Sequence, residues 1–169
     1  GSLEIIVKDD KGRPGSDAVA YAAATGTANA APKKQAVVDQ RDKQFIPYVT
    51  AVQVGTPVIF PNSDNIRHHV YSFSPAKKFE LPLYAGVPAE PVAFDKEGFV
   101  TLGCNIHDWM VAYVAVLPTT FFQVTSRDGR ALLNNLPSGN YTVEVWHASL
   151  KGAPEKFAHG LARAQEGAA

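Results

Sequence analysis

Residues 104–110 concentrate side chains that bind metal ions. Cys104, His107 and Met110 lie in this short segment, and they include the only cysteine and the only methionine of the chain. A thiolate, an imidazole and a thioether form a mixed sulfur and nitrogen donor set, which suits copper better than the oxygen ligands or all-thiolate ligands that other metals prefer. The segment therefore predicts part of a site for one copper ion that alternates between Cu(I) and Cu(II).

Each end of this segment needs a strand to hold its ligands. Residues 99–102 and 111–117 are rich in apolar and β-branched side chains, as strands are. Cys104 would then follow the end of one strand, and Met110 would precede the start of the next. Three ligands so close in sequence can surround one ion at little cost in loop closure. The fourth ligand must come from another strand.

A second imidazole is offered by His68 or His69, upstream of the cysteine. Side chains alternate between the two faces of a strand, so His69 would share a face with Tyr71 and Phe73, which favours His69 as the inward residue. A β-bulge at this point would break the alternation and leave His68 available. The residues alone leave both histidines open as the ligand.

The composition limits the class of protein. The chain has 169 residues, 46% of them hydrophobic, and its 16 basic residues balance 16 acidic ones. This content is ample for a packed core, and no basic cluster with interleaved aromatic residues indicates nucleic-acid binding. The longest apolar run is about eight residues, whereas a membrane-spanning helix needs about 20. We expect no nucleic-acid partner and no membrane span.

Short strands separated by turns dominate the chain. Turn sequences such as Arg127-Asp128-Gly129 and Pro137-Ser138-Gly139 punctuate it. The expected strands are residues 3–7, 18–23, 35–39, 49–54, 57–60, 69–73, 92–94, 99–102, 111–117, 122–125 and 141–146. This pattern predicts an all-β sandwich protein. We expect residues 22–34 to form a loop, and the tail at 151–169 to be a helix or a frayed end.

The middle of the chain, residues 35–117, resembles the cupredoxins, the blue-copper family of Greek-key β-sandwiches. The spacing Cys104-x-x-His107-x-x-Met110 is similar to the ligand loop of amicyanin-like members. Asn62, followed six residues later by His68, resembles the segment that supplies the first histidine in plastocyanin-like members. Sequences of methylamine-utilisation type look similar in both places. The resemblance favours His68 over His69 as the ligand.

The resemblance also implies a role for each site residue. Cys104 would bind as a thiolate, His68 and His107 would complete a trigonal plane, and Met110 would be the long axial ligand. Asn62 would brace the site through hydrogen bonds, and His69 would tie the two ligand segments together.

Two further features of the ligand loop follow from the same resemblance. Electrons would pass through His107, with Ile106 and Trp109 forming part of an apolar docking surface around it. The loop departs from simple electron carriers at Asp108, and Asp64 adds another carboxylate nearby. These donors could lower the reduction potential or permit a different, non-blue coordination.

The two ends of the chain each resemble one part of the same small domain. Residues 3–24 and 119–150 are together similar to a carboxypeptidase-regulatory-like, or transthyretin-like, β-sandwich. The cupredoxin-like segment would then be inserted in a loop of this sandwich, which is where domain insertions are tolerated. The alternative is a tandem arrangement, in which the N-terminal strands belong to the middle domain.

These features together predict a periplasmic carrier of single electrons that docks transiently on redox partner proteins. The alternatives are a copper trafficking or tolerance protein, or a non-blue copper site with small-molecule chemistry. An enzyme is not expected, because a nucleophile built on Cys104 and His107 would need an orienting group and an oxyanion hole. Cys104 and Met110 could each also be simple core residues. His147 and His159 are expected to be surface histidines or histidines with ordinary hydrogen-bond partners.

Overall fold

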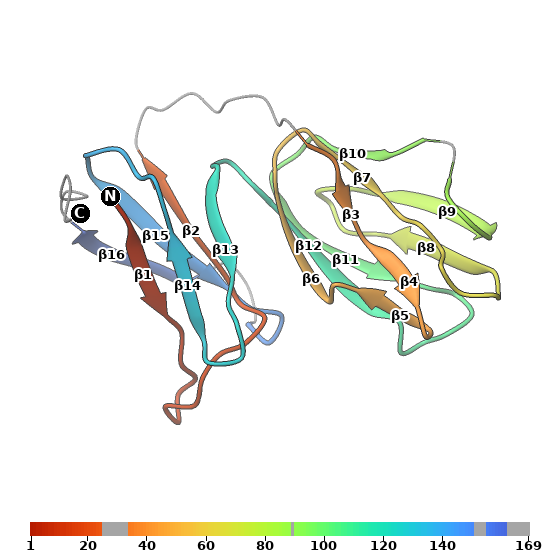
Figure 1. Ribbon diagram of the computed structural model, residues 1–169, viewed down its shortest axis with the longest axis horizontal. Coiled ribbons are helices and arrows are strands. Elements are labelled where there is room, and N and C mark those ends of the chain that lie inside the picture. The colour runs from red at the N-terminus through yellow and green to blue at the C-terminus, as the bar shows by residue number, and fades with distance from the viewer. Residues whose placement is uncertain (25–33, 89, 151–154, 162–169) are drawn as a thin grey trace. The chain divides into compact units, whose positions relative to one another are not determined.

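The computed structural model describes residues 1–24, 34–88, 90–150 and 155–161 (Figure 1). These residues contain β-strands and no α-helix, so the predicted all-β class is confirmed. It follows that no helix in this part of the chain is long and apolar enough to span a bilayer. The chain forms two compact units. Unit 1 is Gly1–Ala30 with Thr119–Ala169, and unit 2 is Ala31–Pro118.

Unit 2 contains two sheets and a separate hairpin. The larger sheet has the order β6 (Val49–Gln53), β12 (Val111–Leu117), β11 (Gly98–Gly103), β8 (His68–Ser72) and β9 (Phe79–Tyr84). The smaller sheet has the order β10 (Val92–Phe94), β7 (Thr56–Ile59) and β3 (Ala36–Val37), and the hairpin joins β4 (Asp39–Arg41) to β5 (Gln44–Ile46). Strand β12 is parallel to β6 and antiparallel to β11.

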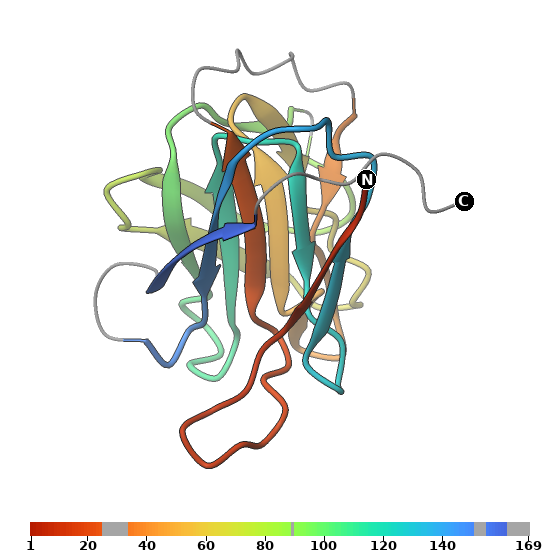
Figure 2. The ribbon, with the colours of Figure 1, turned by 90° about the vertical axis from the view of Figure 1, so that its left-hand side faces the viewer.

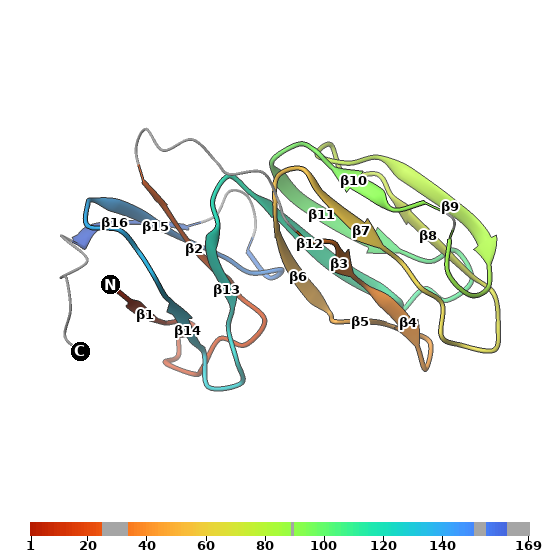
Figure 3. The same cartoon turned by 45° about the horizontal axis from the view of Figure 1, so that its top comes forward.

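The core of unit 2 lies between its two sheets. In β11, Val100 and Leu102 are fully buried while Thr101 between them is exposed, as the alternation of a strand requires. These side chains belong to one cluster with Val58 of β7 and Phe94 of β10, so the two sheets form a β-sandwich (Figure 3). Cys104 and Met110 are part of the same cluster.

Unit 1 is built from segments on both sides of unit 2 in the sequence. Its larger sheet has the order β13 (Phe121–Val124), β2 (Val19–Ala24), β15 (Tyr141–Trp146) and β16 (Glu155–Leu161). The N-terminal strand β1 (Leu3–Ile6) runs beside β14 (Arg130–Leu133), as Figure 2 shows. Ile5 of β1 packs against Ala20 and Val145 of the larger sheet, which gives unit 1 a core of its own. Its likeness to carboxypeptidase-regulatory-like sandwiches and the predicted domain bounds stay predictions.

Five strands were not expected from the sequence, namely β4, β5, β9, β14 and β16; the expected strand at 35–39 corresponds to β3 and reaches only the first residue of β4. The expectation of a helix or frayed end for the tail is wrong for Glu155–Leu161, because this segment pairs with β15. The expected loop at 22–34 is wrong at its start, because β2 continues to Ala24. The rest of both segments, residues 25–33, 151–154 and 162–169, lies outside the described residues.

Candidate metal centre

The loop that carries Cys104, His107 and Met110 connects two neighbouring strands. β11 ends at Gly103 and β12 begins at Val111, and these two residues face each other in the sheet. The N–H of Met110 donates to the carbonyl oxygen of His107 at 3.0 Å, which closes the loop tightly. Pairing of the flanking strands therefore brings the three candidate ligands to one place.

Gly103 allows close packing immediately before the cysteine. A Cβ at this position would lie 2.7 Å from the ring of Tyr71 on β8, which is closer than van der Waals contact permits. The absence of a side chain lets the Tyr71 ring lie directly over the end of β11. The backbone that leads into Cys104 is thus held between β8 and β12.

Three donor side chains meet beside this loop. The nearest ligand atoms of His68, Cys104 and His107 all lie within 4.8 Å of one another. The three residues are 0%, 3% and 8% exposed, and the two imidazole rings are 5.2 Å apart between centroids. Two donors on one ion can lie at most about twice a bond of 2.0–2.3 Å apart. The three donor atoms are therefore close to the spacing at which one ion could contact them all.

The ring nitrogens of the two histidines show which atoms are available. Nε2 of His68 lies 2.6 Å from Oδ2 of Asp64, so this nitrogen is engaged. Nδ1 of His68 and Nδ1 of His107 are buried and have no hydrogen-bond partner among the described residues. A buried polar atom without a partner costs about 1–3 kcal/mol. Two such atoms beside a buried thiol fit a metal site, since a metal ion is the partner that both nitrogens and the sulfur can share.

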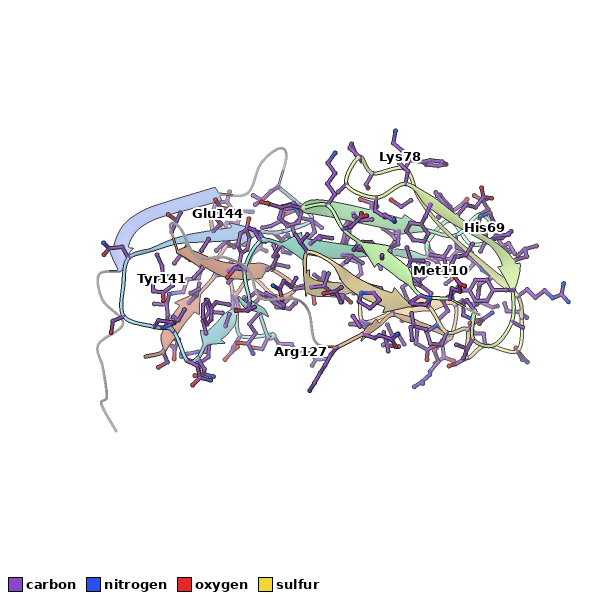
Figure 4. The ribbon with its side chains drawn as sticks, turned by 90° about the horizontal axis from the view of Figure 1, so that it is seen from above. His69, Lys78, Met110, Arg127, Tyr141 and Glu144 are labelled. Carbon is purple, nitrogen blue, oxygen red and sulfur yellow. The ribbon has the colours of Figure 1, made fainter. Side chains whose placement is uncertain are left out.

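Met110 lies on the inner side of the same loop. Its side chain is 1% exposed and packs in the core cluster that contains Cys104. Figure 4 shows Met110 and His69 toward the same end of unit 2. The position of Met110 satisfies the expectation that it precedes β12, and its role as a ligand stays a prediction.

His69 lies outside the donor cluster and has other contacts. Its Nδ1 is 3.1 Å from Nδ2 of Asn105, the residue after the cysteine. Its Nε2 is 3.0 Å from Oε1 of Glu80 on β9, an ion-pair distance at which the atoms are not aligned for a hydrogen bond. His69 therefore links β8 to both the cysteine loop and the edge strand of the sheet.

The alternation argument for His69 as the inward residue is wrong. Val70 and Ser72 are buried on the face of His68, whereas Phe73, on the face of His69, is 79% exposed. The register between β8 and β9 also shifts between His68 and Val70, as at a β-bulge. Aromatic side chains do not mark the inner face of this strand.

Asn62 braces the segment that carries His68. Its Nδ2 donates to the carbonyl oxygens of Ile66 and Tyr84, both at 2.8 Å. Its Oδ1 accepts the backbone N–H of Asp64 at 3.1 Å. These bonds fix the loop between β7 and β8 and so set the place at which Asp64 meets His68.

Asp64 contacts the candidate ligand His68. This contact was not predicted from the sequence. Its carboxylate accepts the backbone N–H groups of Asp42 at 2.7 Å and Lys43 at 2.9 Å, besides its contact with His68. Burial alone would raise the pKa of the Asp64 carboxyl. The hydrogen bonds from His68, Lys43 and Asp42 outweigh burial and lower this pKa below its usual value. The four-residue spacing between Asp64 and His68 was the only signal of this contact in the sequence.

Trp109 and Ile106 are exposed apolar side chains of the loop that carries Cys104 and His107. The Trp109 ring lies 4.9 Å from the His107 ring between centroids, and its Nε1–H donates to the carbonyl oxygen of Lys43 at 3.0 Å. Trp109 is 64% exposed and Ile106 is 50% exposed. Asp108 between them is exposed and is not part of the donor cluster. An exposed apolar ring therefore lies against His107, and its part in docking a partner stays a prediction.

His147 is not part of this cluster. Nδ1 of His147 lies 2.7 Å from the Ser149 hydroxyl, and its Nε2 lies 3.0 Å from the carbonyl oxygen of Ser16. Both of its nitrogens therefore have partners in unit 1. The side chain of His159 lies outside the described residues.

Comparison with known proteins finds similar solved structures only. No protein-family model and no curated protein sequence matches the chain. A Cu-containing nitrite reductase from Thermus scotoductus SA-01 is 24% identical over 56% of this chain, with a TM-score of 0.47, and the match spans 25% of the reductase. A purple cupredoxin from Nitrosopumilus maritimus is 23% identical, with a TM-score of 0.44, over 49% of this chain and 100% of its own. A single-residue mutant of amicyanin in its reduced Cu(I) form is 21% identical, with a TM-score of 0.44, over 57% of this chain and 99% of its own.

Proposed function

We propose that unit 2 is a cupredoxin-type domain that binds one copper ion through His68, Cys104, His107 and Met110 and exchanges single electrons with partner proteins. The observation that carries this proposal is the buried cluster of one thiol and two imidazoles. Their donor atoms lie within 4.8 Å of one another, and Nδ1 of both rings lacks a hydrogen-bond partner among the described residues.

The donor set supports copper over zinc and over the hard cations. Structural zinc sites take four thiolate or imidazole ligands, whereas this cluster has one thiol and two imidazoles, with a thioether in the same loop. Mg²⁺ and Ca²⁺ prefer oxygen ligands, and the cluster offers none. One thiolate, two imidazoles and a weak axial thioether suit a copper ion that changes oxidation state.

The protein's own part is to hold the ligands in one arrangement and to exclude water. Cys104 and Met110 are fixed by the pairing of β11 with β12, and His68 is fixed by Asp64. Copper, when bound, would supply one-electron exchange between Cu(I) and Cu(II). A ligand arrangement that does not change with oxidation state lets an electron enter and leave without moving the protein.

The burial of the ligands favours electron exchange over delivery of the metal. His68 is fully buried and Cys104 is 3% exposed, so release of an ion would require the sandwich to open. His107 is the most exposed of the three, and the exposed side chains of Ile106 and Trp109 lie next to it in sequence. A partner protein could therefore dock over His107 and approach the site without displacing a ligand.

Two further parts of the proposal concern the setting of the protein. The resemblance to amicyanin-like and plastocyanin-like cupredoxins supports the periplasm as the compartment, and fractionation of cells that produce the protein tests this. The strand pairing between both ends of the chain supports a carboxypeptidase-regulatory-like sandwich for unit 1, with unit 2 inserted in it. We propose a binding or scaffolding role for unit 1.

Spectroscopy of the copper-loaded protein tests the proposed function. Titration with Cu(II) should produce an intense visible band from the thiolate and a paramagnetic resonance signal that saturates at one ion per chain. Cys104→Ser should abolish the band. His68→Ala should abolish or change it, whereas His69→Ala, the matched control on the same strand, should leave it in place. A wild-type protein that binds no copper, or a band that survives Cys104→Ser, would overturn the proposal.

A further inference from the structure

One carboxylate lies directly behind a candidate ligand. Oδ2 of Asp64 is 2.6 Å from Nε2 of His68, on the far side of the ring from the unpartnered Nδ1. Only 12% of the Asp64 side chain is exposed, and the His68 side chain is fully buried. This pair is therefore a buried contact, in which a charge acts strongly on its neighbour.

We propose that Asp64 is a positioning residue that fixes the tautomer of His68 and lowers the reduction potential of the bound metal. Only the effect on the reduction potential rests on the proposed function. The tautomer of His68 is a property of the protein without metal.

The tautomer follows from the hydrogen bonding of the two atoms. A carboxylate is an acceptor, so Nε2 of His68 must carry the proton that it donates to Asp64. A neutral imidazole has one protonated nitrogen, which leaves Nδ1 with a free lone pair. His68 belongs to the donor cluster with Cys104 and His107, and its Nε2 is engaged by Asp64, so Nδ1 is the nitrogen left to bind an ion. Asp64 thus keeps Nδ1 unprotonated, with a lone pair that is free to bind a metal ion.

Asp64 is itself held in place by a turn. Asp42 and Lys43 connect β4 to β5, and both have positive φ angles, 52° and 56°. Such a two-residue turn, of the type I′ geometry common in hairpins, directs its two backbone N–H groups at the Asp64 carboxylate. With His68 as the third donor, the carboxylate cannot rotate away without losing several hydrogen bonds.

The same turn is also linked to the second imidazole, through Trp109. The carbonyl oxygen of Lys43 accepts the Nε1–H of Trp109, whose ring lies against His107. One backbone turn therefore supports both candidate histidine ligands, through Asp64 on one side and Trp109 on the other. This gives the short hairpin a structural role beside the site.

The effect on the potential follows from charge. A carboxylate that accepts the Nε2 proton makes the imidazole a stronger electron donor at Nδ1. It also places a negative charge one ring away from the metal. Both effects stabilise Cu(II) more than Cu(I), because the more highly charged ion interacts more strongly with a negative group. Asp64 should therefore lower the reduction potential.

The test compares Asp64→Asn with Asp39→Asn. Asp39 is a matched control, because its side chain is 16% exposed, it lies in the β4–β5 hairpin whose turn binds Asp64, and it contacts Ser63 and Arg41 rather than a ligand. Both variants remove one negative charge. The potential is measured by equilibrating the copper protein with a redox mediator. Asp64→Asn should favour reduction about tenfold or more, which corresponds to about 59 mV for one electron, and Asp39→Asn should change the ratio less than threefold.

A second measurement needs no metal and no variant. Nitrogen NMR of the His68 ring in the folded apoprotein should show that Nε2 is protonated and Nδ1 is unprotonated. If Nδ1 carries the proton, the inference is overturned even where copper binds. If the tautomer is as expected but Asp64→Asn changes the potential no more than Asp39→Asn does, the effect on the potential is refuted. Failure of the wild type to bind copper would instead overturn the proposed function and leave the tautomer result standing.

Discussion

Copper should stabilise unit 2 against heat and leave unit 1 unchanged. The candidate ligands come from two segments of unit 2, and Cys104 and Met110 pack in its core cluster. Unfolding of unit 2 separates His68 from the cysteine loop and destroys the site. Unit 1 has its own core clusters and contributes no residue to the donor cluster. The metal therefore acts as a ligand of folded unit 2 alone.

The size of the effect can be worked out in two ways. Binding to the folded form at a free copper concentration 100 times the dissociation constant stabilises it by about 2.7 kcal/mol. The two unpartnered Nδ1 atoms cost about 1–3 kcal/mol each in the apoprotein, so their relief is of the same order. Because a domain of 60–100 residues shifts by about 4–8 °C for each kcal/mol, the midpoint of unit 2 should rise by about 11–22 °C.

Differential scanning calorimetry of the apo and copper-loaded protein measures this shift. We expect two transitions, one of which moves with copper. His69→Ala should keep the shift, and His68→Ala should lose most of it, because His68 belongs to the donor cluster and His69 does not. The reasoning is refuted if copper shifts neither transition, shifts both equally, or shifts the His68→Ala protein as much as the wild type.

Three further substitutions probe other parts of the structure. Met110→Leu conserves volume in the buried core and should cost less than about 1.5 kcal/mol of apoprotein stability. It should raise the reduction potential, because the axial thioether is lost. An unchanged potential would remove Met110 from the ligand set. Gly129→Ala should lower the midpoint of unit 1 only, because its φ is +77° and a Cβ would lie 2.4 Å from the carbonyl oxygen of Val7; calorimetry showing a change in unit 2 instead would contradict this. Burial raises the pKa of Tyr84 to about 12, whereas unfolded tyrosine titrates near 10, so its contribution to stability is complete below about pH 10 and is lost as the pH rises toward 12. Tyr84→Phe should therefore weaken the alkaline loss of stability in denaturant titrations, and equal slopes in both proteins would argue against it.

The hairpin beside the site shows how tertiary context overrides local signals. Strands β4 and β5 are three residues each, and their turn is Asp42-Lys43 rather than the Asn-Gly or Asp-Gly that marks such turns in sequence. The turn is stabilised from outside by the Asp64 carboxylate, 21 residues or more away in the chain. No pattern within the hairpin could have predicted it.

Edge strands escaped prediction for a related reason. β9 (Phe79–Tyr84) contains Pro82 and Glu80, which lower its strand propensity. Proline is tolerated at the edge of a sheet, where one side of the strand makes no ladder bonds, and β9 is the last strand in its sheet. Central strands such as β12 have no such freedom, and their predicted bounds agree with the structure.

The sequence by itself determined the all-β class, the strands that flank the cysteine loop, and the grouping of Cys104, His107 and Met110, because period-two hydrophobicity and close spacing are local properties. Only the tertiary structure placed His68 rather than His69 beside Cys104 and His107, and brought Asp64 into contact with the buried His68 ring. The first depends on which face of β8 packs against the core, and the second on a turn from a distant hairpin. Both are contacts between segments far apart in the chain, and these form only when the sheets have packed.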